Sequence, residues 1–183
     1  MVAVSMVDDI HPLTVEEYLR LAESSPSWER TELIWGVVYD MAAQYDLHAG
    51  TAARIYDAFK VLFPGDIVRF GGSVRLGDHS AVDPDVYVID GSVPFDRNAL
   101  VPGELLKVVV EVCVSTHNRD LGPKLRAYAS AGVPQYWVVD PRPEAGYLLR
   151  HTGPTGDAYA RIRRFAVGEG AEELAAAAVL AGE

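Results

Sequence analysis

The sequence is poor in cysteine and in basic residues. Cys113 is the single cysteine among 183 residues, so an intramolecular disulfide and a cysteine-based zinc site within one chain are both excluded. Lys and Arg number 16 against 26 Asp and Glu, which gives a formal net charge of −10. This balance disfavours a nucleic-acid binder that relies on bulk positive charge. An acidic chain can still act on nucleic acid where basic residues cluster locally or where its carboxylates hold cations.

Long apolar runs are also missing. The longest, around residues 175–181, is far shorter than the about 20 residues that a membrane span needs. The first nine residues have no basic residue ahead of their apolar part, which is not typical of a secretory signal. We therefore expect a cytoplasmic protein without a membrane span. Apolar residues make up 49% of the chain, which excludes intrinsic disorder and is enough to build a core at this length.

The order of the expected elements predicts an α/β fold with a central mixed sheet flanked by helices. Thr14, with Glu17 three residues later, predicts a capping box at the start of the first helix. The expected elements are a helix over 14–23, hairpin strands over 28–35 and 37–41, a helix over 46–62, strands over 67–76, 82–90 and 105–114, a helix over 120–131, a strand over 135–139, hairpin strands over 146–151 and 159–165, and a weak helix over 171–181. We expect residues 1–183 to form one domain, with a core over about 14–165 and peripheral tails over 1–13 and 166–183.

Two carboxylates stand out in the predicted strands. Asp85 follows a proline at a strand start, and Glu111 lies within the Val-rich strand, on the parity opposite the valines at 108, 110, 112 and 114 that we expect to be buried. A carboxylate in an otherwise apolar strand is costly unless it is paired or binds a metal. If the two strands are neighbours, Asp85, Glu111 and the backbone carbonyl of Val112 suffice to hold a hard cation such as magnesium. Such a site activates water and stabilises charge on a phosphate.

Simpler interpretations of the same residues remain open. Asp85 is also typical of a turn at a strand start, and Glu111 shares its parity with Lys107, with which it can pair. Asp120 and Lys124 are spaced i, i+4 on the predicted helix, which is typical of a surface ion pair that contributes little. Alternatively, Lys124 reaches back over the strand end toward Glu111.

Several segments together resemble a known family. They are ELIWGVVY at 32–39, His48, Pro84-Asp85-Val86, Glu111-Val112, DLGPK at 120–124 and YASAGVPQYWVVD at 128–140. In this order they resemble a large bacterial restriction-endonuclease-like family, long catalogued as a domain of unknown function, in the PD-(D/E)XK nuclease superfamily. The resemblance runs over about residues 14–165. The segment over 128–140 is its most specific part, whereas the Pro-Asp pair is not specific.

The resemblance implies a restriction-endonuclease-like fold with a magnesium or manganese site. Asp85 and Glu111 would be its two acids. The superfamily's lysine normally stands two residues after the second acid, where this chain has Cys113. The family's helix lysine is thought to substitute, which points to Lys124 as the third catalytic residue.

Three further residues are expected near the cleft. Glu32 and His48 match recurrent family positions, although a satisfied strand-end carboxylate and a helix-terminus histidine explain them equally well. Asp120 is expected to orient Lys124 or to cap its helix rather than to bind metal.

The resulting hypothesis is a metal-dependent endonuclease that hydrolyses DNA phosphodiester bonds. The alternative is a catalytically degenerate nuclease fold that binds nucleic acid or a protein partner without cleaving, which the missing strand lysine and the net charge favour. We also expect a homodimer, because restriction-endonuclease folds often act as dimers and the closing hairpin offers an edge strand.

Overall fold

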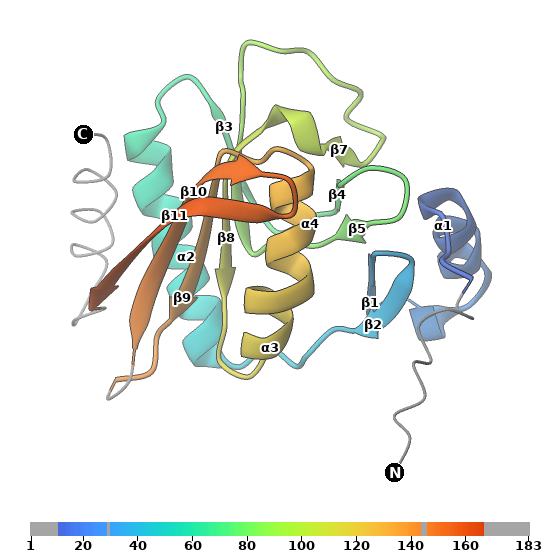
Figure 1. Ribbon diagram of the computed structural model, residues 1–183, viewed down its shortest axis with the longest axis horizontal. Helices are drawn as coiled ribbons and strands as arrows, with labels where there is room; N and C mark the ends of the chain where they lie inside the picture. The colour runs from blue at the N-terminus through green and yellow to red at the C-terminus, as the bar shows by residue number, and fades with distance from the viewer. Residues whose placement is uncertain (1–10, 29, 144–145, 167–183) are drawn as a thin grey trace.

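A computed structural model of the protein describes residues 11–28, 30–143 and 146–166, and these form two β-sheets with helices packed around them (Figure 1). The larger sheet has the order β11-β10-β9-β8-β6-β3 and the smaller β2-β1-β5-β4-β7. The larger sheet comprises β3 (Ile67–Phe70), β6 (Val86–Ile89), β8 (Leu106–Val112), β9 (Gln135–Asp140), β10 (Tyr147–Thr155) and β11 (Ala158–Ala166). The smaller comprises β1 (Thr31–Ile34), β2 (Val37–Asp40), β4 (Val74–Arg75), β5 (Ala81–Val82) and β7 (Val101–Pro102). The α/β class with mixed sheets is confirmed, but the strands divide between two sheets.

Two of the helices cover opposite faces of the larger sheet, and the first packs on the smaller one. The helices are α1 (Val15–Ser24), α2 (Asp46–Leu62), α3 (His117–Arg119) and α4 (Leu125–Ser130), with a π-helical segment Asp120–Lys124 between the last two. Ala52, Ile55 and Phe59 of α2 pack on one face, and Ala127 and Tyr128 of α4 pack on the other (Figure 1). Within the described ranges, no helix combines the length and the apolarity needed to cross a bilayer.

The first helix begins as predicted. The Thr14 side chain accepts a hydrogen bond from the Glu17 backbone N–H at 3.2 Å, and the Thr14 N–H donates to Glu17 Oε2 at 2.9 Å. This reciprocal pair is the capping box that the sequence predicts. The helix then packs Val15 and Tyr18 against β1 and β5 of the smaller sheet.

Strand β8 is buried on both faces, which corrects the expectation that one parity alone is buried. Val108 and Val110 pack with α2, while Val109 and Cys113 belong to the core on the α4 side. The reason is that helices cover both faces of the larger sheet, so residues 108–112 of β8 are buried on whichever face they project, and Lys107 is the exposed residue of this strand. Glu111 therefore projects into a covered face.

Two predicted strands are broken, and each break carries the chain from one sheet to the other. The strand expected over 67–76 divides into β3 and β4 at Gly71 and Gly72, whose φ angles are +66° and +101°. These left-handed values end a strand and are readily adopted by glycine. The strand expected over 82–90 divides into β5 and β6 at residues 83–85, where Pro84 has no N–H for a ladder. The Asp83-Pro84-Asp85 segment thus lies at the junction of the sheets.

A short strand, β7, lies in the segment 91–103 that the sequence predicts to be a loop. The other differences lie at element ends. β1 begins at Thr31 rather than residue 28, because residues 26–28 form a 3₁₀ turn. The helix expected over 120–131 begins earlier, at His117, and departs from helical geometry at Gly122 (φ −114°, ψ −106°). The closing hairpin is longer than predicted, and the helix expected over 171–181 lies outside the described residues.

His151 makes the stability of this core depend on pH. Its ring is buried beside Tyr136 and Tyr159, and burial lowers its pKa below the ordinary 6.5. Because the unfolded chain binds the proton more readily, the stabilisation is complete above about pH 6.5 and is lost as the pH falls below it. We expect the melting temperature to fall more between about pH 7.5 and 5.5 in the wild type than in His151→Gln, measured by circular dichroism. Equal falls in the two proteins would contradict this.

Candidate active site

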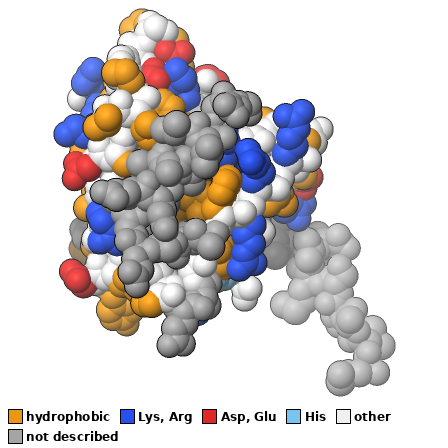
Figure 2. All heavy atoms as spheres, turned by 90° about the vertical axis from the view of Figure 1, so that its left-hand side faces the viewer, with side chains coloured by type: hydrophobic (Ala, Val, Ile, Leu, Met, Phe, Trp, Pro, Cys, Tyr) orange, Lys and Arg blue, Asp and Glu red, His pale blue; other side chains and the backbone are white. Residues whose placement is uncertain are grey.

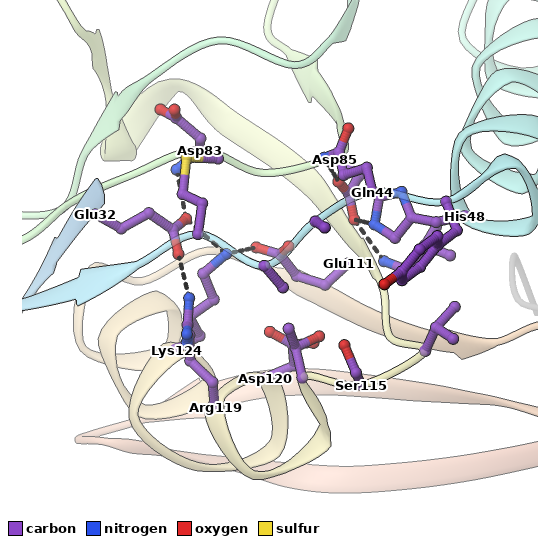
Figure 3. A pocket seen from close by; sticks show the side chains of 17 residues that line it. Glu32, Gln44, His48, Asp83, Asp85, Glu111, Ser115, Arg119, Asp120 and Lys124 are labelled. Carbon is purple, nitrogen blue, oxygen red and sulfur yellow. Dashed lines mark hydrogen bonds and ion pairs between the residues drawn. The ribbon is translucent and has the colours of Figure 1, made fainter. Parts of the chain in front are cut away.

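A pocket opens where the two sheets meet (Figure 3). Its walls come from β1, the start of α2, the crossing segment 83–85, the carboxyl end of β8, and the turns from α3 to Lys124. All the residues that the sequence singles out line this pocket: Glu32, His48, Asp85, Glu111, Val112, Asp120 and Lys124. Residues separated by up to 92 positions in the chain are therefore brought together, whereas Cys113 stays outside.

Lys124 is buried between two carboxylates. Its Nζ lies 2.9 Å from Glu111 Oε1 and 2.8 Å from Glu32 Oε1, and its side chain is only 5% exposed. The surface ion pair with Asp120 is therefore the wrong interpretation, and the reach back to Glu111 is the right one. The pairing of Glu111 with Lys107 is also wrong, because Lys107 pairs with Asp66 at 2.8 Å.

The charge of Lys124 is fixed by its surroundings. Burial disfavours the ammonium form, but the negative charges of Glu111 and Glu32, with Asp120, outweigh burial and raise the pKa of Lys124 above its ordinary value. Lys124 is therefore protonated at physiological pH. It serves as a permanent cation in the pocket and is not available as a general base.

Glu111 is held from two sides through one oxygen. Lys124 Nζ and the Tyr128 hydroxyl of α4, at 2.8 Å, both donate to Oε1. Its Oε2 accepts no hydrogen bond from the described part of the chain. Burial raises the pKa of Glu111 well above its usual range; Lys124 opposes that rise, and the nearby charge of Asp85 adds to it. Because burial and the charge of Asp85 disfavour the ionised form of Glu111, a further cation nearby would stabilise its carboxylate.

Asp85 is held at the junction of the sheets. Its Oδ2 accepts the Val112 backbone N–H at 2.7 Å and lies 3.1 Å from His48 Nε2, and Gln44 Nε2 donates to Oδ1 at 3.4 Å (Figure 3). Burial disfavours the charged form of His48, but the hydrogen bond to Asp85 and the negative charge of Asp85 outweigh burial and raise the pKa of His48. His48 Nδ1 is buried with no hydrogen-bond partner among the described residues.

The pocket carries more negative than positive charge. Its carboxylates are Glu32, Asp83, Asp85, Glu111 and Asp120, and its fixed cations are Lys124 and Arg119. A hard divalent cation with oxygen ligands suits this donor set. The part of the chain that the structure describes has no cluster of three or more His, Cys, Asp or Glu placed to hold a metal ion. A divalent cation in this pocket would therefore be held by two carboxylates and a backbone oxygen, with water as the further ligands.

Comparison with known proteins identifies the family. The profile of the Uma2 family, described as "Putative restriction endonuclease", matches residues 15–180. The chain belongs to the Uma2 family. A crystal structure of a "putative nuclease belonging to DUF820" from Anabaena variabilis ATCC 29413 matches with a TM-score of 0.65 at 17% identity, covering 85% of this chain and 86% of that chain. At that identity the match shows a shared fold. No curated protein matches the chain. The family confirms the resemblance found in the sequence and supports a nuclease-type function.

In this Uma2 protein, Cys113 stands two residues after Glu111, where the superfamily usually has lysine, and its side chain does not line the pocket. Cys113 is fully buried in the core on the α4 side, and burial raises the pKa of its thiol to about 12. It is a small core residue rather than a nucleophile. The cation comes instead from Lys124, in the irregular turn after Gly122.

Asp120 has a partner other than the expected one. Its carboxylate accepts a hydrogen bond from the Thr116 hydroxyl, four residues earlier, and burial raises its pKa although Lys124 opposes this. Thr116 is the N-cap residue of α3. Asp120 therefore fixes the start of this helical segment, and it affects Lys124 through charge alone.

Two residues that contact the carboxylates of the Uma2 pocket, Arg119 and Tyr128, are not singled out as site residues by the sequence. Arg119 lies 3.5 Å from Glu32 Oε2, and its guanidinium stands over the Tyr39 ring. No local pattern distinguishes it from the other arginines of the chain. Tyr128 donates to Glu111, and its spacing of four residues from Lys124 is the signal that could have placed both side chains over the same strand.

Proposed function

We propose that the protein is a magnesium- or manganese-dependent endonuclease that hydrolyses DNA phosphodiester bonds. The observation that carries this proposal is the buried Lys124 ammonium shared by Glu111 and Glu32, in a pocket that Asp85 also lines. Acid, acid and lysine are the residue types that the PD-(D/E)XK chemistry uses. Here the lysine reaches the second acid from a helix.

Asp85, Glu111 and the backbone carbonyl of Val112 would hold the cation. The unbonded Oε2 of Glu111 and the excess of carboxylates support this assignment. A bound cation would supply Lewis acidity and lower the pKa of a coordinated water.

The chain's own residues position and balance charge around the reacting phosphate. Lys124 presents a fixed positive charge beside Glu111, suited to the negative charge that develops on the phosphate in the transition state. Tyr128 and Lys124 hold the orientation of Glu111. His48 and Gln44 hold that of Asp85. Supporting bonds of this kind commonly orient ligand carboxylates.

A second candidate is a nuclease fold that binds nucleic acid or a protein partner without cleaving. Cys113 at the usual lysine position is the observation that favours it. The position of Lys124 supports the first candidate over this one, because a cation is present at Glu111 despite the cysteine.

Nicking of supercoiled plasmid tests the two candidates. We expect the wild type to nick DNA with manganese and to stop when chelator is added, and we expect Glu111→Gln to be inactive because it removes a charged metal ligand. Glu104→Gln is the matched control, since it makes the same change at an exposed carboxylate outside the pocket and the hairpin. A wild type that binds DNA but does not nick it with any metal tested would favour the second candidate.

A further inference from the structure

The closing hairpin concentrates positive charge in an acidic protein. Strands β10 and β11 carry Arg150, Arg161, Arg163 and Arg164, while the whole chain has a net charge of −10. The hairpin's one carboxylate, Asp157, lies 2.6 Å from Arg126 of α4 and is already paired. Figure 2 views the molecule from the left-hand side of Figure 1, and several Lys and Arg side chains lie at the surface there.

The three arginines of β11 are exposed. Among the described residues, Arg161, Arg163 and Arg164 form no ion pair. Arg163 stacks over Phe165 and Arg164 over Tyr147, with centroid distances of 5.5 and 4.8 Å. Aromatic support of this kind restricts a guanidinium while leaving its N–H groups available to an anion.

The register of the larger sheet relates this edge to the pocket. Glu111 pairs with Val138, Val138 with Leu149, and Leu149 with Arg164. Residues paired in this way project from the same face, so Arg164 shares the face of Glu111. Arg161 and Arg163 have the other parity along β11 and project from the opposite face, so the three side chains flank the edge from both sides. Three strand spacings separate the two residues by about 14 Å. β11 also runs parallel to β8, so its carboxyl end lies at the same end of the sheet as the pocket (Figure 1).

We propose that the β11 edge, formed by Arg161, Arg163 and Arg164, binds the sugar–phosphate backbone of the DNA substrate on one side of the scissile phosphate. This inference rests on the proposed function. The separation of about 14 Å corresponds to about four nucleotides along one strand of a duplex. Backbone contacts at that distance give affinity and register without reading the base sequence.

The same charges argue against a second copy of the chain as the occupant. Pairing of two β11 edges would place arginines opposite arginines, and like charges directly across a strand pair are destabilising. Charged side chains on an edge are a common protection against such pairing. The homodimer expected from the sequence stays a prediction, and this edge is a poor candidate for its interface.

Binding of a fluorescein-labelled DNA duplex, measured by fluorescence anisotropy in chelator over a range of salt concentrations, tests the proposal. The test variant is Arg161→Ala/Arg163→Ala/Arg164→Ala. The matched control is Arg20→Ala/Lys60→Ala/Arg97→Ala, which removes the same charge from exposed positions outside the hairpin. Each lost phosphate contact lowers the slope of log K against log salt by about 0.9, so we expect the test variant to lose about 2 to 3 and the control almost nothing. In cleavage assays the test variant should raise KM and keep kcat, because the edge does not touch the reacting atoms.

The outcomes separate this inference from the proposed function. Cleavage by the wild type with equal salt slopes in both triple variants would overturn the β11 proposal alone. Loss of slope in the test variant, with no cleavage by any protein, would support the β11 edge and overturn the endonuclease. A wild-type dimer that becomes a monomer in the test variant, measured by sedimentation velocity, would make β11 a subunit interface and overturn the inference.

Discussion

Lys124→Met is expected to lower DNA cleavage by about a hundredfold or more, because it removes preorganised charge from the site of the transition-state phosphate. It is also expected to destabilise the fold by about 3–5 kcal/mol, since removing one partner of a buried ion pair leaves uncompensated charge. Both effects follow from the burial of Nζ between Glu32 and Glu111. Plasmid nicking and denaturant unfolding measure them.

A second substitution separates activity from stability. In Lys124→Met/Glu32→Gln one of the two stranded carboxylates becomes neutral, so part of the lost stability should return while cleavage stays absent. Glu32→Gln alone keeps Lys124 paired with Glu111 and should retain measurable cleavage. If a folded Lys124→Met protein cleaved DNA at the wild-type rate, a catalytic role for this lysine would be refuted.

Asp85→Asn is expected to abolish stabilisation by manganese as well as cleavage. A ligand at about 100 times its Kd stabilises a protein by about 2.7 kcal/mol, which corresponds to about 5–10 °C in melting temperature for a chain of this size. Wild type should show such a rise with manganese, and Asp85→Asn should show none. Without metal, Asp85→Asn should be less stable than wild type by no more than about 1 kcal/mol, because it removes one charge from a pocket rich in carboxylates.

Asp83→Asn is the matched control for this experiment. Asp83 lines the same pocket two residues earlier, and burial raises its pKa. It is not among the residues expected to hold the cation, so its variant should keep the manganese response. Equal rises in wild type and Asp85→Asn would place the ion elsewhere, and loss of the rise in Asp83→Asn would redefine the ligand set.

Local signals in the sequence predict the first two helices and the two hairpins well. The capping box at Thr14 needs only residues within one turn, and α1 begins there. The strands over 67–76 and 82–90 fail because strand-like residues resume after each break, while Gly71, Gly72 and Pro84 are the residues that redirect the chain. Which sheet a segment joins depends on distant partners, and no local pattern records that.

Some contacts of the candidate site can be predicted from the sequence and others cannot. Glu111 and Lys124 are 13 residues apart on a strand and the turn that follows it, so their contact can be predicted from the chain alone. Glu32 reaches them from the other sheet, and only the family resemblance indicates it. The sequence does not indicate that Lys124 is buried, because its spacing of four residues from Asp120 is also typical of a surface ion pair.

Lys124 also joins the two sheets mechanically. Glu32 belongs to β1 of the smaller sheet and Glu111 to β8 of the larger, so one ammonium group links both through bonds of 2.8 and 2.9 Å. The spacing of the charges in the pocket is therefore set by how the two sheets dock. If the proposed function holds, a substitution in the packing between the sheets, far from any reacting atom, will change this spacing and with it the rate of cleavage.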